Sequence, residues 1–176
     1  MQEILDIVNE KDEVVGRNTR ENVHKFKLLH REAYMWIFND VGEVVLQKRS
    51  DTKEQYPGLW FYSLGGHVSS GENYIESVTR EAYEEIGIEV FENNLIFLDK
   101  VFIENDGNNH FETIYAYKYK NKYDTIKIAS EELNGLMWIN IDNLLNPDED
   151  FKKQIVPYLF NEKSKEILNK IKQLIK

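Results

Sequence analysis

The chain contains no cysteine, and only three of its 176 residues are proline. Without cysteine there can be no disulfide, no thiolate nucleophile and no zinc or iron–sulfur site with cysteine ligands. No apolar run approaches the roughly 20 residues of a membrane-spanning helix. The acidic N-terminus MQEILDIVNEKDE is interrupted by charges and is not typical of a signal peptide. We therefore expect a cytoplasmic protein that does not associate with membranes.

Positive charge is also scarce, because 22 basic residues stand against 31 acidic ones, a formal net charge of −9. A surface of this sign does not attract a nucleic-acid polymer. It also repels small anions unless a cation mediates their binding. Apolar residues make up 41% of the chain and aromatic residues 12%, which is enough to bury a core.

The pattern of apolar residues predicts a single domain over residues 1–176, with an N-terminal strand region at 1–30, a core at 31–146 and C-terminal helices at 147–176. Strands are predicted at residues 4–8, 14–16, 33–38, 44–47, 95–104, 111–119 and 136–139. Helices are predicted from about residue 73 to 86, ending at Gly87, and near 141–145, 151–160 and 163–175. Because strands and helices do not alternate regularly, the predicted fold class is α/β with a mixed sheet.

The predicted helix at 73–86 has two faces. One is an apolar stripe whose members are three or four residues apart: Ile75, Val78, Ala82 and Ile86. The other face gathers Glu81, Glu84 and Glu85, whose centre lies roughly 110° around the helix from the stripe at about 100° per residue. The stripe can be buried while the carboxylates face a cleft, where Mg²⁺ or Mn²⁺ would offset their repulsion. The alternative is a solvated acidic face.

A spaced motif surrounds this helix. It reads Gly66, five residues, Glu72, seven residues, Arg80-Glu81-Ala82, one residue, Glu84-Glu85, one residue, Gly87-Ile88. The segment resembles the Nudix box at every fixed position, and roughly residues 30 to 145 resemble the Nudix hydrolase family. The resemblance implies an α/β/α sandwich with a mixed sheet and a catalytic loop and helix.

The resemblance also implies roles for the matching positions. Glu84 and Glu85 would bind the Mg²⁺ or Mn²⁺ ion with help from the Gly66 carbonyl. Glu81 would be a further ligand or the base that deprotonates the attacking water.

Two other positions of the motif would organise these glutamates. Arg80 would hold them by charge-assisted hydrogen bonds, and Glu72 would fix the junction of loop and helix or contact a water. The implied function is hydrolysis of a small-molecule diphosphate linked to another moiety. A protein of charge −9 needs metal ions to neutralise such a polyanion.

A narrower resemblance points to the branch of this family that contains isopentenyl-diphosphate isomerase. It rests on Lys48-Arg49, Lys53, the YPGLW loop, the GGH before the helix and two earlier histidines. It implies that Arg49 and Lys53 face a diphosphate, that His67 sits at a metal-binding histidine and that Glu112 lies near a catalytic glutamate. That isomerase needs a cysteine where this chain has Gly65. An isomerase and a noncatalytic Nudix-fold binding module are the two alternatives to a hydrolase.

We expect Trp60 to line the substrate pocket, His24 and His30 to be surface or strand-end residues, and His110 to be solvated in a turn. The C-terminal amphipathic helix should pack on its own domain or on a partner subunit. The sequence leaves the substrate, the number of metal ions and the choice between monomer and homodimer open.

Overall fold

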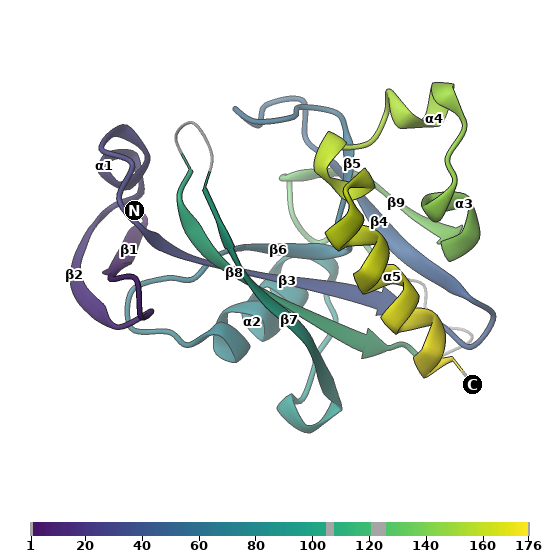
Figure 1. Cartoon of the computed structure of the whole chain (residues 1–176), viewed down its shortest axis with the longest axis horizontal. Helices are drawn as coiled ribbons and strands as arrows, with labels where there is room; N and C mark the ends of the chain where they lie inside the picture. The colour runs from purple at the N-terminus through teal and green to yellow at the C-terminus, as the bar shows by residue number, and fades with distance from the viewer. Residues whose placement is uncertain (1, 105–107, 121–125, 176) are drawn as a thin grey trace.

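The centre of the molecule is a mixed seven-stranded sheet (Figure 1). The computed structural model describes residues 2–104, 108–120 and 126–175. The strands are β3 (His30–Phe38), β4 (Glu43–Arg49), β5 (Trp60–Phe61), β6 (Leu64–His67), β7 (Leu95–Ile103), β8 (His110–Lys118) and β9 (Leu133–Asn140). Their order is β5-β4-β3-β8-β7, with β6 also paired to β3 and β9 to β4. The pair β3–β8 is parallel and the others are antiparallel, so the predicted mixed sheet is confirmed.

The sheet divides at the β3–β4 hairpin. These strands are paired at Phe38 and Val44 and then diverge, β3 pairing with β6 and β4 with β5. The Ser63 hydroxyl joins them near the branch, because it donates to the Val45 carbonyl at 2.6 Å and accepts from the Ile37 N–H at 2.8 Å. The short strands β5 and β6 therefore diverge: β5 lies along β4, and β6 places the Gly65–His67 segment alongside β3.

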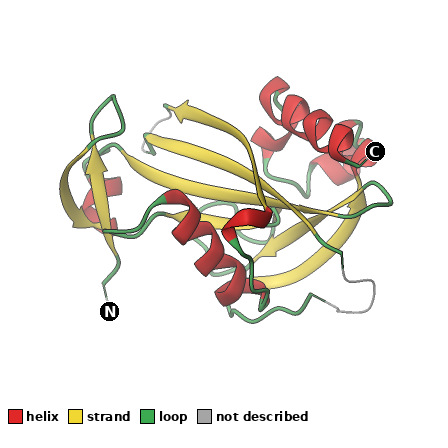
Figure 2. Cartoon of the chain, turned by 90° about the horizontal axis from the view of Figure 1, so that it is seen from below, coloured by secondary structure: helices red, strands yellow, loops and turns green. Residues whose placement is uncertain are grey.

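Helices cover both faces of the sheet (Figure 2). Met35 and Ile37 of β3 pack with α2 (Tyr74–Ile86), whereas the alternate residues Trp36 and Phe38 lie in the core beneath the C-terminal helices. Those helices are α3 (Ile141–Leu145), the 3₁₀ helix η2 (Pro157–Phe160) and α5 (Glu162–Leu174). This arrangement confirms the α/β/α sandwich.

The N-terminal segment forms a separate two-stranded antiparallel sheet. Strand β1 (Ile4–Val8) pairs with β2 (Val14–Thr19), and helix α1 (Arg20–Lys25) leads from β2 toward β3. Ser70 and Gly71, in the loop before α2, donate to the Asp6 carboxylate at 2.6 and 3.0 Å. The segment is thereby fastened to the loop of the motif.

One predicted helix is wrong. Residues 151–160 are the end of α4 (Glu149–Lys152), a turn, a β-bridge at Ile155 and η2. The Trp60 N–H donates to Gln154 at 2.8 Å and the Val156 N–H donates to Trp60 at 3.0 Å, so this stretch pairs with β5. Pro157 begins η2, and a proline disfavours helical geometry at the residue before it. Tertiary pairing and proline together interrupt the helical pattern.

Helix α5 buries Ile167, Leu168 and Ile171 in the core of its own domain. This confirms that its apolar stripe packs within the chain. Among the described residues, no helix is long and apolar enough to span a membrane.

Candidate active site

Helix α2 is defined at both ends by local chemistry. At its start, the Asn73 side chain accepts from the backbone of Ile75 and Glu76, and Glu76 accepts in return from the Asn73 N–H. This capping box satisfies N–H groups that have no partner inside the helix. Gly87 ends the helix with a positive φ of 69°. The stripe residues Val78, Ala82 and Ile86 are buried, as predicted, which turns the glutamate face toward a cavity.

Arg80 joins three glutamates of the motif. Its Nε donates to Glu72 at 2.8 Å, and its Nη1 donates to Glu81 at 2.8 Å and to Glu84 at 2.9 Å. Glu72 also accepts from the Ser69 N–H at 3.3 Å, so it ties the loop to the helix without lining the cavity. These hydrogen bonds, with that to Glu72 contributing most, raise the pKa of Arg80 above its ordinary value. The result is a fixed frame of carboxylates.

Glu85 lies beneath this frame and is only 6% exposed. The Gly65 N–H donates to its Oε2 at 3.4 Å. Burial, followed by the neighbouring Glu81 carboxylate, raises the pKa of Glu85 to about 8. Burial also raises the pKa of Glu81, although Arg80 partly offsets the effect. Glu81 and Glu85 are buried near each other, so ionising both carboxylates at once is unfavourable. A hard divalent cation favours the ionised form and binds its oxygen atoms, so this donor set fits Mg²⁺ or Mn²⁺.

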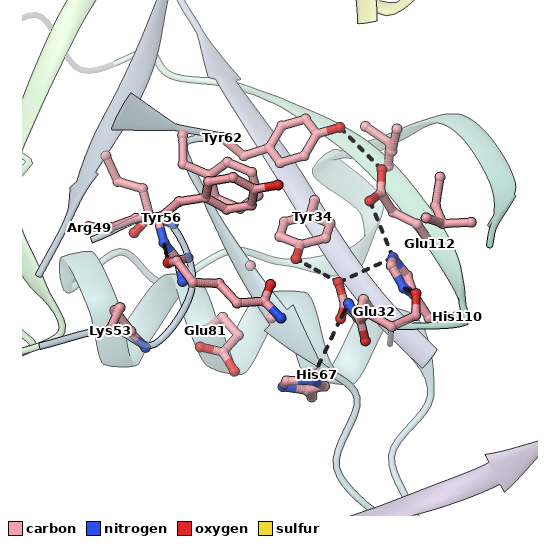
Figure 3. Close-up of a pocket in the computed structure, with 18 of the residues that line it drawn as sticks. Glu32, Tyr34, Arg49, Lys53, Tyr56, Tyr62, His67, Glu81, His110 and Glu112 are labelled. Carbon is pink, nitrogen blue, oxygen red and sulfur yellow. Dashed lines mark hydrogen bonds and ion pairs between the residues drawn. The ribbon is translucent and has the colours of Figure 1, made fainter. Parts of the chain in front are cut away.

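A cavity of about 1020 Å³ lies beside this face. Apart from Glu72 and Trp60, all of the predicted site residues line it: Arg49, Lys53, Gly66, His67, Arg80, Glu81, Glu84, Glu85 and Glu112. In Figure 3, Arg49 and Lys53 approach from one side, and Glu32, His67 and Glu112 lie on the other. Arg49 is held by a hydrogen bond from its Nε to the Gln55 carbonyl at 3.0 Å, and Lys53 forms an ion pair with Glu132.

Trp60 does not line this cavity, contrary to prediction. Its indole lies beneath the Lys48 ammonium, 5.8 Å from the ring centroid, and close to Gly135. Successive side chains of a strand point to opposite faces, so the next residue, Phe61, faces the cavity instead.

The cavity is also lined by two carboxylates from the sheet, Glu32 and Glu112, of which the sequence predicted only Glu112. The parallel register of β3 and β8 sets Glu32 opposite Glu112 and His30 opposite His110. Both strands begin with the same His-x-Glu spacing, a signal that could have drawn attention to Glu32. Pairing these two triplets requires knowledge of the sheet order.

Tyrosine hydroxyls and His110 connect the two carboxylates (Figure 3). Tyr34 donates to Glu32 at 2.7 Å and Tyr62 donates to Glu112 at 3.1 Å. His110 Nε2 lies 3.3 Å from Glu32 and 3.7 Å from Glu112. Burial opposes ionisation of Glu32, but His110 and the other nearby histidines outweigh it and hold the Glu32 pKa well below its ordinary value. Burial raises the pKa of Glu112, and the Glu32 charge adds to this effect.

His30 begins β3, which confirms the predicted strand-end position, although its side chain is only 1% exposed. The prediction for His110 is wrong: it begins β8 and is 4% exposed instead of being solvated in a turn. His24, in α1, is half-buried, and its Nε2 lies 3.0 Å from Nε2 of His67. Burial lowers the pKa of His67 to about 3. The His24 ring, from the N-terminal segment, packs against those of His30 and His67, with ring centroids 5.3 and 5.0 Å away, and the local sequence does not show this contact.

Comparison with known proteins agrees with this geometry. The Nudix domain family matches residues 28–159. An uncharacterized Nudix hydrolase of Clostridium acetobutylicum is 32% identical over 150 residues, which cover 81% of this chain and 72% of that protein. An uncharacterized Nudix hydrolase of Yersinia pestis is 40% identical over 86 residues, 49% of this chain and 47% of that protein, so the match spans about half of each.

Among solved structures, the crystal structure of DR0079 from Deinococcus radiodurans superimposes with a TM-score of 0.74. It is 25% identical and covers 96% of this chain and 98% of its own. The matched residues include the whole motif from Gly66 to Ile88, with each of its glutamates and Arg80 in place. The chain therefore belongs to the Nudix hydrolase family, whose members act on diphosphates with the aid of divalent metal ions.

Proposed function

We propose that this protein is a Mg²⁺- or Mn²⁺-dependent hydrolase that cleaves a small-molecule diphosphate linked to another moiety. The observation that carries the proposal is the carboxylate frame of α2. Arg80 binds Glu72, Glu81 and Glu84 together, and the buried Glu85 beside them has its pKa raised to about 8. Carboxylates held in this way can bind a divalent cation, which in turn binds a substrate phosphate.

The metal ligands would be Glu84, Glu85 and the Gly66 carbonyl, with Glu81 as a further ligand or the base. A bound divalent ion would neutralise phosphate charge and lower the pKa of a coordinated water. Oxygen ligands of this kind suit hard cations.

The protein's own groups would bind and orient the substrate. Arg49 and Lys53 line the cavity on the side opposite Glu32 and Glu112 and would contact the phosphates. Lys53 is paired with the exposed carboxylate of Glu132, and a substrate phosphate would replace that carboxylate as the partner of Lys53. Together Arg49 and Lys53 bring two positive charges to the cavity of a protein whose net charge is −9.

In the chemical step, water attacks phosphorus and the bond from that phosphorus to the bridging oxygen breaks. Glu81 would take the proton of the water. Its raised pKa makes it a stronger base than an exposed carboxylate, and a catalytic pKa nearer the working pH favours general-base catalysis. The phosphate on the other side of the broken bond departs.

The experiment is a screen of nucleoside, sugar-nucleotide, dinucleotide and isoprenoid diphosphates with Mg²⁺ titrated, in isotopically labelled water. We expect at least one to be cleaved, with the label entering a product phosphate. Glu84→Gln should lower turnover by roughly two orders of magnitude or more, because a charged ligand is lost. Glu89→Gln is the matched control, since Glu89 is exposed and lies outside the cavity.

Two results would overturn the proposal. One is an absence of cleavage across the panel at every Mg²⁺ concentration, as the noncatalytic binding module predicts. The other is a Glu84→Gln variant that turns over as fast as Glu89→Gln.

A further inference from the structure

The hairpin of β1 and β2 contacts the loop that leads from β6 to α2 (Figure 1). Leu5 of β1 forms a β-bridge with Ser69, and the Ser70 hydroxyl donates to the Asp6 carboxylate at 2.6 Å. Residues 69–73 of the loop are not buried themselves. Contacts with the hairpin therefore take the place of apolar burial in holding the loop of the motif.

Asp12, in the turn between β1 and β2, joins this hairpin to three further elements. Its carboxylate accepts from Nε of Arg31 in β3 at 2.5 Å. It also accepts from the hydroxyl of Tyr74, the first residue of α2, at 2.8 Å. The Lys100 ammonium, in β7, forms an ion pair with the same carboxylate. One side chain of the hairpin thus contacts the sheet and the start of the helix together.

The environment of Asp12 makes these contacts stronger than those of a surface ion pair. Its side chain is only 10% exposed. Burial opposes the ionisation of Asp12, but Lys100, Arg31 and Tyr74 outweigh it and hold the Asp12 pKa below its ordinary value. An ionised carboxylate that is shielded from water interacts strongly with its partners.

The two cations that bind Asp12 also lie against the ring of Tyr74. The Arg31 guanidinium carbon is 5.4 Å from the ring centroid, and the Lys100 ammonium is 5.1 Å from it. Asp12 supplies the negative charge that balances both cations. Without that charge, Tyr74 would lose its anionic acceptor and remain beside two positive groups, so the start of α2 would no longer be held in place.

Arg31 extends the connection to the segment before the helix. Its carbonyl accepts from the Val68 N–H at 2.9 Å, and Val68 lies two residues after Gly66. Asp12 is therefore connected through Arg31 to the segment that contains the Gly66 carbonyl. Through Tyr74 it is connected to the helix that carries the glutamates of the motif.

We propose that Asp12 is a positioning residue for the metal site of the hydrolase: it fixes the start of α2 relative to the Gly66 segment and so sets the spacing between the Gly66 carbonyl and the glutamates of the helix. This inference rests on the proposed function, because it concerns the same divalent ion. The Nudix match begins at residue 28, so Asp12 lies in a part of the chain that the family match does not include.

The test is a titration of the full chain with Mn²⁺, in which electron paramagnetic resonance measures the free ion. All variants are compared at a temperature where circular dichroism shows them to be folded. The binding that Glu84→Gln removes identifies the α2 site. Asp12→Asn should weaken that binding about tenfold, the lower end of the range for groups that orient metal ligands. The φ of Asp12 is 62°, and asparagine adopts this conformation readily, so the variant removes the charge and keeps the turn.

Asp99→Asn is the matched control. The Asp99 carboxylate also binds two cations, Lys163 at 2.7 Å and Lys170 at 3.0 Å, but these contacts join β7 to α5 and not to the motif. We expect this variant to bind Mn²⁺ as tightly as wild type. A loss of metal affinity that followed from weakened ion pairing in general would appear in both variants.

Tyr74→Phe tests the route by which Asp12 acts, because it removes only the hydroxyl that Asp12 accepts from. It should weaken Mn²⁺ binding roughly threefold in the wild-type background, near the low end of coupling between residues in contact. It should have no further effect in the Asp12→Asn background, where the anionic acceptor is already gone.

Two results would overturn the inference and leave the proposed function intact. One is an Asp12→Asn protein that binds Mn²⁺ as tightly as Asp99→Asn. The other is a Tyr74→Phe substitution that weakens binding by the same factor in both backgrounds. A wild-type protein that binds no more Mn²⁺ than Glu84→Gln would overturn the proposed function together with this inference.

Discussion

Gly65 and Ala33 lie so close across the β6–β3 pair that a side chain at position 65 would collide with the Ala33 carbonyl oxygen. A Cβ atom there would also lie 2.7 Å from Cα of Tyr34, closer than real Cβ contacts. The φ of Gly65 is 137°, a conformation that other residues rarely adopt. The backbone of β6 therefore has no room for the cysteine on which the isomerase branch of the family depends.

The first prediction concerns this packing. Gly65→Ala should destabilise the fold by several kcal/mol, because the clash is with backbone and cannot be relieved by moving a flexible side chain. Gly71→Ala is the matched control. Its φ is also positive, at 88°, but a Cβ there meets nothing within 4 Å, so it should cost only about 1 kcal/mol. Urea denaturation compares the two, and equal losses would contradict the close approach of β6 and β3.

The second prediction is that the protein has no isomerase activity. Allylic isomerisation moves a proton between carbons and needs an acid and a base on opposite faces of the alkene. Glu112 could supply one of them, but the chain has no thiol to supply the other. Isopentenyl diphosphate incubated with the protein and Mg²⁺ should yield no dimethylallyl diphosphate above background, as measured by chromatography. Product formed at enzymatic rates would show that another residue replaces the cysteine.

The third prediction concerns the two faces of α2. Val78 is fully buried in the stripe, so Val78→Asp places an unpaired charge in the core and should destabilise the fold by about 3 kcal/mol or more. Tyr83 lies on the same helix but is 67% exposed, and Tyr83→Asp should change stability by only about 0.5 kcal/mol. Thermal and urea unfolding measure both. A Val78→Asp protein as stable as Tyr83→Asp would mean that the assigned faces are reversed.

The features that sequence predicted well are local. The period of Val78, Ala82 and Ile86 and the stop at Gly87 define α2 without reference to the rest of the fold. The resemblance of the motif also implied that Arg80 holds the glutamates of α2. It does so for Glu81 and Glu84, whereas Glu85 accepts from the Gly65 N–H instead.

The features that sequence missed depend on contacts between distant segments. Glu32 meets Glu112 only through the parallel register of β3 and β8, and no local pattern gives that register. His30 packs against His24, which the N-terminal segment supplies from a distant part of the fold. Similarly, residues near Ile155 lose their helical pattern because they pair with Trp60.

The last prediction concerns pH and rests on Glu85. Its pKa is about 8 in the metal-free fold, against an ordinary value of 4.5, because it is buried beside Glu81. The folded state therefore holds a proton that the unfolded chain releases between these two values. The contribution of Glu85 to the free energy of unfolding is therefore largest below pH 4.5. It is lost as the pH rises to about 8, at up to about 1.4 kcal/mol per pH unit. The metal-free protein should therefore lose stability through the titration of Glu85 as the pH is raised.

Glu85→Gln isolates the effect, because the amide has nearly the same shape and does not titrate. His67 acts in the opposite sense: its pKa of about 3 makes the fold less stable as the pH falls below 6.5, but it does so in both proteins and cancels in their difference. Urea unfolding in a chelator from pH 5 to 8 should show wild type losing stability relative to Glu85→Gln. Saturating Mg²⁺ should remove that slope, because a cation favours the ionised carboxylate, and its affinity should rise with pH as the proton is released. Parallel stability curves in the chelator would show that Glu85 is ionised without metal and that burial does not hold its proton.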